Sequence, residues 1–157
     1  MPDIRLLLVD ANDDLLDAYA AWLALQPGVR VAGRAHSCAE AVSRAMELAP
    51  DVIVMDVSLP DASGLHATRR IKAEVEGPFV VLTSFHVNET VRREARAAGA
   101  DACVSKSDIT EQLISEIPDC KRYRNQRDAE RDPPRQRRSE CRERHAPMTF
   151  ASTVGTA

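Results

Sequence analysis

Four short apolar runs in this chain each end beside a polar residue. The runs are residues 6–9 before Asp10, residues 52–55 before Asp56, residues 79–82 before Thr83, and residues 102–105 before Lys106. Apolar runs of this length are typical of buried strands, and helical patterns separate them here. Because alternating strands and helices form a parallel sheet, the strands all end at the same edge. The sequence therefore predicts that two carboxylates, a hydroxyl and an ammonium group meet at the edge where open α/β sheets place their sites.

The rest of the pattern completes a doubly wound, five-stranded parallel sheet. A further, weaker strand is expected over residues 29–35. Ser37, with Glu40 three residues later, predicts a capping box at the start of a helix. Asp108 with Glu111 is expected to cap the last helix, and Pro118 is expected to end it, because no helical apolar period follows that proline.

The charges divide the chain near residue 118. Residues 1–118 hold 11 Lys and Arg against 18 Asp and Glu, whereas residues 119–157 hold 10 against 6. We expect residues 1–118 to form one domain, whose acidic balance argues against nucleic acid as its main partner. We expect residues 119–157 to be a disordered tail, because an Arg-rich segment without apolar periodicity cannot bury enough surface to fold. Binding of nucleic acid or of an acidic partner by that tail stays open.

Membrane insertion and secretion are not expected from the sequence. No apolar stretch approaches the length of a membrane span, so we expect no membrane partner. Met1-Pro2-Asp3 lacks the basic and then apolar start of a signal peptide. These features predict a cytoplasmic protein.

The polar residues at the strand ends constrain one another. Taken singly, each has a simpler explanation, because such residues often cap the next helix or are solvated. Asp10 and Asp56, however, repel each other by roughly 4 kcal/mol if both are ionised about 4 Å apart at an effective dielectric constant of about 20. The ammonium of Lys106 or a divalent cation would relieve this repulsion. Oxygen ligands in a shallow crevice suit Mg²⁺, which keeps several waters and binds one or two carboxylates.

Residues 4–117 resemble the receiver domain of bacterial two-component response regulators. The matching motifs are residues 54–64 around Asp56, the Leu82-Thr83-Ser84 strand end, and residues 99–102 leading to Lys106. Ser107-Asp108 follows the lysine without the proline that many receivers carry, which is more like the receivers joined to helix-turn-helix output domains. The resemblance implies a flavodoxin-like three-layer α/β sandwich.

The resemblance also implies roles for individual residues. Asp56 falls on the phosphoacceptor, Thr83 on the switch hydroxyl and Lys106 on the lysine that pairs with the phosphoryl group. Asp10 falls on the first of two acidic metal ligands, and the backbone carbonyl of Ser58 on another ligand. The implied cofactor is Mg²⁺.

Two positions depart from the family pattern. Ala11 stands where the second acidic residue, a direct metal ligand, is usual, so we expect weak Mg²⁺ binding. Asp13 lies in the same loop and is the candidate substitute ligand. Cys103 stands where an aromatic residue usually moves on activation. We therefore expect the signal to run mainly through Thr83.

The predicted function is that of a phosphoacceptor signalling domain in a two-component phosphorelay. The family implies that Asp56 receives its phosphoryl group from a histidine kinase or a phosphotransfer protein, and that the domain then switches a protein-interaction surface. It is expected to be no enzyme, with at most slow self-dephosphorylation, and a homodimer stays open. The main alternative is a pseudo-receiver that is not phosphorylated and acts as an interaction module. A phosphohydrolase fits less well, because its usual acid two residues after Asp10 would be Asn12.

Overall fold

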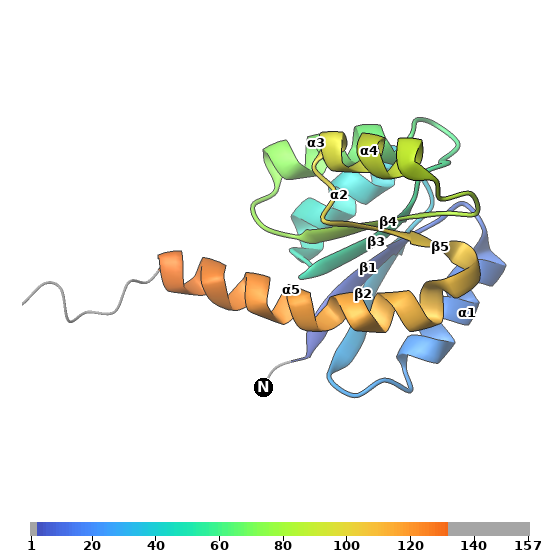
Figure 1. The fold of residues 1–157 in the computed structure, drawn as a ribbon. Coiled ribbons are helices and arrows are strands. Elements are labelled where there is room, and N and C mark those ends of the chain that lie inside the picture. Colours follow the sequence, from blue (N-terminus) through green and yellow to red (C-terminus); the bar gives the residue numbers. More distant parts are fainter. Residues whose placement is uncertain (1–2, 132–157) are drawn as a thin grey trace, which may run out of the picture.

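The computed structural model describes residues 3–131, which form an α/β domain with one parallel sheet (Figure 1). The elements in chain order are β1 (Ile4–Val9), α1 (Asp13–Leu23), β2 (Val29–Ala35), α2 (Cys38–Leu48), β3 (Val52–Asp56), α3 (Gly64–Glu74), β4 (Phe79–Ser84), α4 (Glu89–Ala98), β5 (Ala102–Ser105), the 3₁₀ turn η1 (Lys106–Asp108) and α5 (Ile109–Arg131). The five strands lie in the order β2-β1-β3-β4-β5, and every pairing is parallel. The predicted fold class is confirmed.

The helices form a layer on each face of the sheet, as Figure 1 shows. Helices α1 and α5 pack on one face, and α2, α3 and α4 pack on the other. Side chains along β1 point alternately to the two faces of the sheet. Leu6 and Leu8 pack in the core under α1 and α5, whereas Leu7 and Val9 pack in the core under α2, α3 and α4. Each of these fully buried side chains stabilises the fold by about 1.5–3 kcal/mol. The sheet is thus buried on both faces, and its carboxyl edge is left for polar groups.

Side-chain caps start the helices next to that edge. The Ser37 hydroxyl accepts a hydrogen bond from the Glu40 amide at 3.1 Å, which confirms one half of the predicted capping box. The other half differs, since the Glu40 carboxylate accepts from the His36 amide at 3.0 Å. Asn12 caps α1 in the same way, through the Leu15 amide at 3.2 Å. Caps of this kind each stabilise a helix by about 1 kcal/mol.

The predicted end of the last helix at Pro118 is wrong. The helix α5 begins at Ile109, close to the expected start, but continues through Pro118 to Arg131. Proline removes one hydrogen bond, to the carbonyl of Ile114, and this loss does not stop the helix. The segment that follows is rich in Arg, Lys, Gln and Glu, which have good helix propensities. Of the expected tail, residues 119–131 belong to α5, and residues 132–157 lie outside the described part of the chain.

Among residues 3–131, no helix combines the length and the apolar character that crossing a bilayer requires.

Candidate functional site

The carboxyl edge of the sheet carries the polar residues that follow the apolar runs. Asp56 is the last residue of β3 and lies in register with Thr83 on β4. Asp10 directly follows β1, and its amide continues the ladder by donating to the Ala35 carbonyl at 3.1 Å. Lys106 follows β5 as the first residue of η1. Since β1, β3, β4 and β5 are neighbours in the sheet, their ends place these side chains within one short row.

The ammonium of Lys106 bridges the two carboxylates. Its Nζ atom donates to Asp10 Oδ2 at 2.6 Å and lies 3.1 Å from Asp56 Oδ2. The side chains of Lys106, Asp10 and Asp56 are only 3%, 5% and 11% exposed. The structure therefore brings together the two carboxylates and the ammonium as the sequence predicted.

Electrostatics keep this lysine charged. Burial acts to lower the pKa of Lys106, but its hydrogen bonds to Asp10 and Asp56 outweigh that effect and leave the pKa raised. Lys106 is therefore charged at neutral pH. Lys106 is thus held in place by Asp10 while it faces the Asp56 carboxylate.

Phe85 covers the same lysine, and the sequence analysis missed it. Its ring centroid lies 4.9 Å from Lys106 Nζ, within the range of a cation–π contact. The ring is 61% exposed, which is unusual for a residue of this size. Thr83, two residues earlier, is buried at the end of β4. The available signal in the sequence was a large aromatic residue directly after the Leu82-Thr83-Ser84 strand end.

The loop after Asp56 is held close to the strand. The Gly64 amide donates to the Val57 carbonyl at 2.8 Å, and a Cβ atom at Gly64 would collide with the Asp56 carbonyl oxygen. Only glycine therefore permits this approach. Within the loop, Ser58 forms an isolated antiparallel bridge with Ser63. The role of the Ser58 carbonyl as a metal ligand stays a prediction.

Asp61 connects this loop to the next layer of helices. Its carboxylate accepts hydrogen bonds from the amides of Cys38 at 2.7 Å and Ala39 at 3.0 Å, at the start of α2. The Cys38 amide, and then the Ala39 amide, hold the pKa of Asp61 below its usual value. The loop that follows Asp56 is thereby tied to α2.

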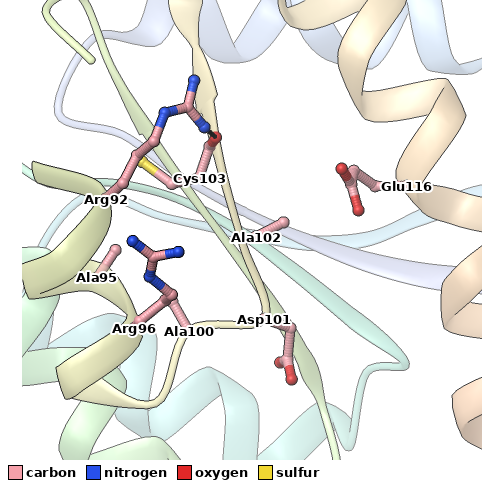
Figure 2. Close-up of a pocket in the computed structure, with 8 residues that line it drawn as sticks. All are labelled: Arg92, Ala95, Arg96, Ala100, Asp101, Ala102, Cys103 and Glu116. Atoms are coloured by element: carbon pink, nitrogen blue, oxygen red, sulfur yellow. Dashed lines mark hydrogen bonds between the residues drawn. The ribbon is translucent and has the colours of Figure 1, made fainter. Parts of the chain in front are cut away.

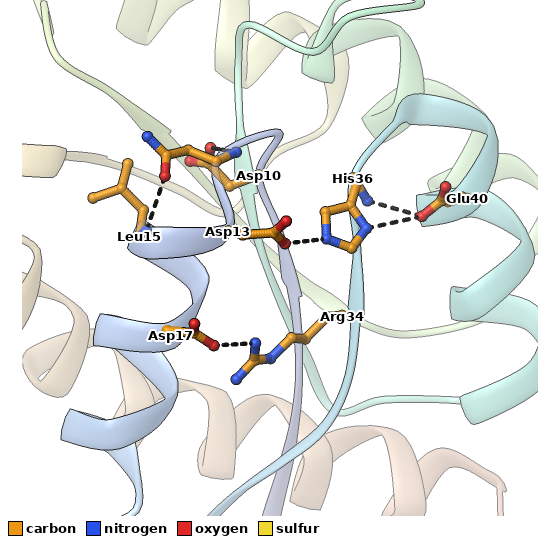
Figure 3. A network of polar contacts seen from close by, with 8 residues as sticks. Asp10, Asp13, Leu15, Asp17, Arg34, His36 and Glu40 are labelled. Atoms are coloured by element: carbon orange, nitrogen blue, oxygen red, sulfur yellow. Dashed lines mark hydrogen bonds and ion pairs between the residues drawn. The ribbon is translucent and has the colours of Figure 1, made fainter.

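Asp13 contacts His36 and not the carboxylate pair, and its role as a substitute metal ligand stays a prediction. Figure 3 shows its side chain turned toward His36, with Oδ1 2.7 Å from His36 Nε2. The other ring nitrogen of His36 lies 3.3 Å from Glu40 Oε2. The hydrogen bond to Asp13 is the main cause that raises the pKa of His36. Asp13 is therefore engaged at the end of β2, on the far side of β1 from Asp56.

The residues present do not form a complete Mg²⁺ site. Among residues 3–131, no three Asp, Glu, His or Cys side chains gather closely enough to hold a metal ion by themselves, so Mg²⁺ bound here would also need backbone oxygen and water as ligands. Asp10 Oδ2 already accepts from Lys106, and Asp10 Oδ1 accepts from the Asn12 amide at 2.9 Å. Ala11 supplies no side-chain oxygen. The edge is thus a lysine-bridged carboxylate pair.

Tyr19, on α1, adds a buried hydroxyl that sequence reasoning also missed. In the described part of the chain its oxygen is buried without a hydrogen-bond partner. Burial raises the pKa of Tyr19, and the charges of Lys106, Asp10 and Asp56 also act on it. Burying an unsatisfied hydroxyl costs free energy, so this group is destabilising as it stands.

Cys103 lies in the wall of a separate hollow of about 210 Å³ between α4, β5 and α5 (Figure 2). Arg92 and Arg96 lie on the α4 side, and Glu116 lies on α5. The Arg92 guanidinium donates to the Cys103 carbonyl at 3.2 Å. The hollow contains none of the residues of the carboxylate pair, so it is a feature of the helical flank and not part of the site.

The sequence of the chain has clear relatives. A sequence model of the response regulator receiver domain matches residues 6–118. The transcriptional regulatory protein LiaR of Bacillus subtilis (strain 168) is 42% identical over 83 residues, which cover 52% of this chain and 39% of LiaR. The protein-glutamate methylesterase/protein-glutamine glutaminase 1 of Syntrophus aciditrophicus (strain SB) is 35% identical over 108 residues, covering 68% of this chain and 31% of that protein. The chain thus spans less than half the length of each of these curated relatives.

Solved structures show the same arrangement. A two-component response regulator of the LuxR family from Aurantimonas sp. SI85-9A1 superimposes with a TM-score of 0.70 and 29% identity, covering 74% of this chain and 83% of that one. The response regulator domain of Thermotoga maritima CheB superimposes with a TM-score of 0.70 and 28% identity, covering 75% of this chain and 96% of that one.

Proposed function

Because the chain belongs to the family of response regulator receiver domains, we propose that Asp56 is its phosphoacceptor. Receiver domains of two-component systems act in phosphoacceptor signalling, and this chain has such a domain. The observation that carries the assignment is the Lys106 ammonium, which lies 3.1 Å from Asp56 Oδ2 and is anchored by Asp10 at 2.6 Å. A carboxylate beside a fixed cation is suited to receive an anionic group.

The transfer is a displacement at phosphorus. An Asp56 carboxylate oxygen attacks the phosphorus of a phosphohistidine, the new O–P bond forms, and the N–P bond breaks. The electron pair of the broken bond stays on the histidine of the donor, which takes up a proton. Lys106 shifts its contact from Asp56 Oδ2 to a phosphoryl oxygen while Asp10 continues to hold it. Receiver domains interact with histidine kinases or phosphotransfer proteins, and one of these would be the donor here.

Thr83 is proposed to pass on the signal. It lies beside Asp56 in the β3–β4 register, so its hydroxyl can donate to an oxygen of the new phosphoryl group. Moving Thr83 would draw in the segment after β4, which contains Phe85 and therefore the cover over Lys106. The local charge change would thus alter the surface formed by that segment.

Several further assignments belong to this proposal. Receiver domains generally bind Mg²⁺ at the phosphorylation site, and here we propose weak binding at Asp10 and Asp56, with the Ser58 carbonyl. A cytoplasmic location is proposed because response regulators generally work there. The methylesterase activity named for a relative is not carried over, since the match covers 31% of that protein. The domain boundary at residue 118, a homodimer and any role of the tail stay predictions.

A pseudo-receiver is the second candidate, because the metal ligands are incomplete and Cys103 replaces an aromatic. A phosphorylation assay distinguishes the two. The full chain is incubated with acetyl phosphate, with and without Mg²⁺, and intact mass is measured for the wild type, Asp56→Asn and Asp17→Asn. Asp17 is the control, since its carboxylate is exposed and paired with Arg34 at 2.6 Å. We expect one phosphoryl group on the wild type and Asp17→Asn and none on Asp56→Asn. An unmodified wild type favours the pseudo-receiver.

A further inference from the structure

His36 lies between two carboxylates at the carboxyl edge of the sheet. It follows β2, the edge strand next to β1, and so lies at one end of the row that contains Asp10 and Asp56. Its ring contacts Asp13 through Nε2 at 2.7 Å and Glu40 through Nδ1 at 3.3 Å (Figure 3). The Glu40 carboxylate also accepts a hydrogen bond from the backbone amide of His36, so Glu40 holds both the ring and the backbone of His36. The ring is therefore oriented by α2 and presented to α1.

Asp13, the partner of His36, is an acidic residue close to Asp10 in the sequence. Asp13 lies three residues after Asp10, at the start of α1, in the loop where Ala11 supplies no ligand. Its contact with His36 directs it toward β2, whereas Lys106 reaches in from β5 to bridge Asp10 and Asp56. Asp13 and Asp10 thus contact different partners on opposite sides of β1: His36 binds Asp13, and Lys106 binds Asp10.

We propose that His36 is a positioning residue that holds Asp13 away from the Asp10–Asp56 pair, so that Lys106 is the main counter-cation of the edge and divalent cations bind weakly. The incomplete metal site described above is then a consequence of the His36–Asp13 contact as well as of Ala11. Without His36, the Asp13 side chain can turn toward the pair and supply a third carboxylate. This proposal concerns the site of the proposed phosphoacceptor but does not require that Asp56 be phosphorylated.

The test measures Mn²⁺ binding to the full chain by the electron paramagnetic resonance signal of free Mn²⁺, with no phosphodonor present. The key variant is His36→Ala, which removes an exposed ring. Arg34→Ala is the matched control, because it breaks the Arg34–Asp17 pair between the same two elements, β2 and α1, without releasing Asp13. The double variant His36→Ala/Asp13→Asn removes the released carboxylate, and Ala11→Asp serves as a reference with an added ligand.

The expected result is a Kd for Mn²⁺ that falls about two- to fivefold in His36→Ala, the range that loss of an exposed ion pair allows. The fall should be absent in Arg34→Ala and reversed in the double variant. The proposal is overturned if Arg34→Ala tightens binding as much, which would indicate a general charge effect. It is also overturned if His36→Ala binds Mn²⁺ as the wild type does while Ala11→Asp binds more tightly. In either case the mass assay on Asp56 still stands as a separate test of the proposed function.

Discussion

Replacing Lys106 by methionine should remove about 3–5 kcal/mol from the free energy of unfolding. The ammonium lies 2.6 Å from Asp10 and 3.1 Å from Asp56, and all three side chains are nearly buried. At an effective dielectric constant of about 20, each contact corresponds to about 5–6 kcal/mol of attraction, most of which offsets the desolvation of the charges. Methionine keeps the volume of the side chain but leaves two carboxylates facing each other without a cation.

The assay is urea denaturation at pH 7, followed by Trp22 fluorescence and by far-ultraviolet circular dichroism. Because the pKa of Lys106 is raised in the folded state, its stabilisation is fully present below the unfolded value of about 10.4 and is lost as the pH rises through the folded pKa. At pH 7 the whole effect is therefore measured. The matched control is Lys72→Met, which breaks the Lys72–Asp101 pair, also at 2.6 Å but with both side chains more than a fifth exposed.

We expect Lys72→Met to cost about 1 kcal/mol or less, since partly solvated pairs contribute little. The triple variant Lys106→Met/Asp10→Asn/Asp56→Asn should regain most of the loss, because no unpaired charge remains at the edge. The reasoning is refuted if Lys106→Met costs no more than Lys72→Met, or if the triple variant is as unstable as the single one.

Three other changes test neighbouring features. Tyr19→Phe should raise the free energy of unfolding by about 1 kcal/mol in the same urea assay, because it removes a buried hydroxyl without a partner; a clear loss would show that the hydroxyl is satisfied. Gly64→Ala should cost about 1–3 kcal/mol and slow phosphorylation by acetyl phosphate, because its Cβ meets the Asp56 carbonyl; an unchanged unfolding midpoint and rate would contradict this. The His36 pKa, measured by NMR titration of its ring, should fall in Asp13→Asn. The stabilisation from protonated His36 should be complete below the unfolded pKa of about 6.5 and lost as pH rises through the folded pKa, and a titration unaffected by Asp13→Asn would count against the contact.

The sequence alone was sufficient for the fold and for most of the site. Strands in a parallel sheet that is buried on both faces are almost continuously apolar. The apolar runs before Asp10 and Asp56 could therefore be recognised as strands from the sequence. Because helices alternate with these strands, the sheet is parallel, and the strands therefore all end at one edge. The meeting of Asp10, Asp56 and Lys106 follows from these local and topological rules, without knowledge of any side-chain contact.

The end of the last helix was not predicted correctly from the sequence. The last helix was expected to stop at Pro118 because no apolar periodicity follows it, yet α5 continues to Arg131. Periodicity reports whether a segment has a face to bury, whereas a polar helix depends on propensity and on an already formed helix to extend. The pattern therefore marked the end of the packed part and not the end of the helix.

The tertiary structure decided which polar groups pair. Asp13 was expected as a substitute ligand beside Asp10, but it contacts His36, which is 23 residues away in the sequence. Likewise, the closeness of the Phe85 ring to Lys106 depends on how the ends of β4 and β5 lie side by side. Strand and helix positions follow from interactions between near neighbours in the chain, which a sequence pattern records. The direction of a polar side chain at the sheet edge depends on groups from other strands, and only folding brings those groups within hydrogen-bond distance.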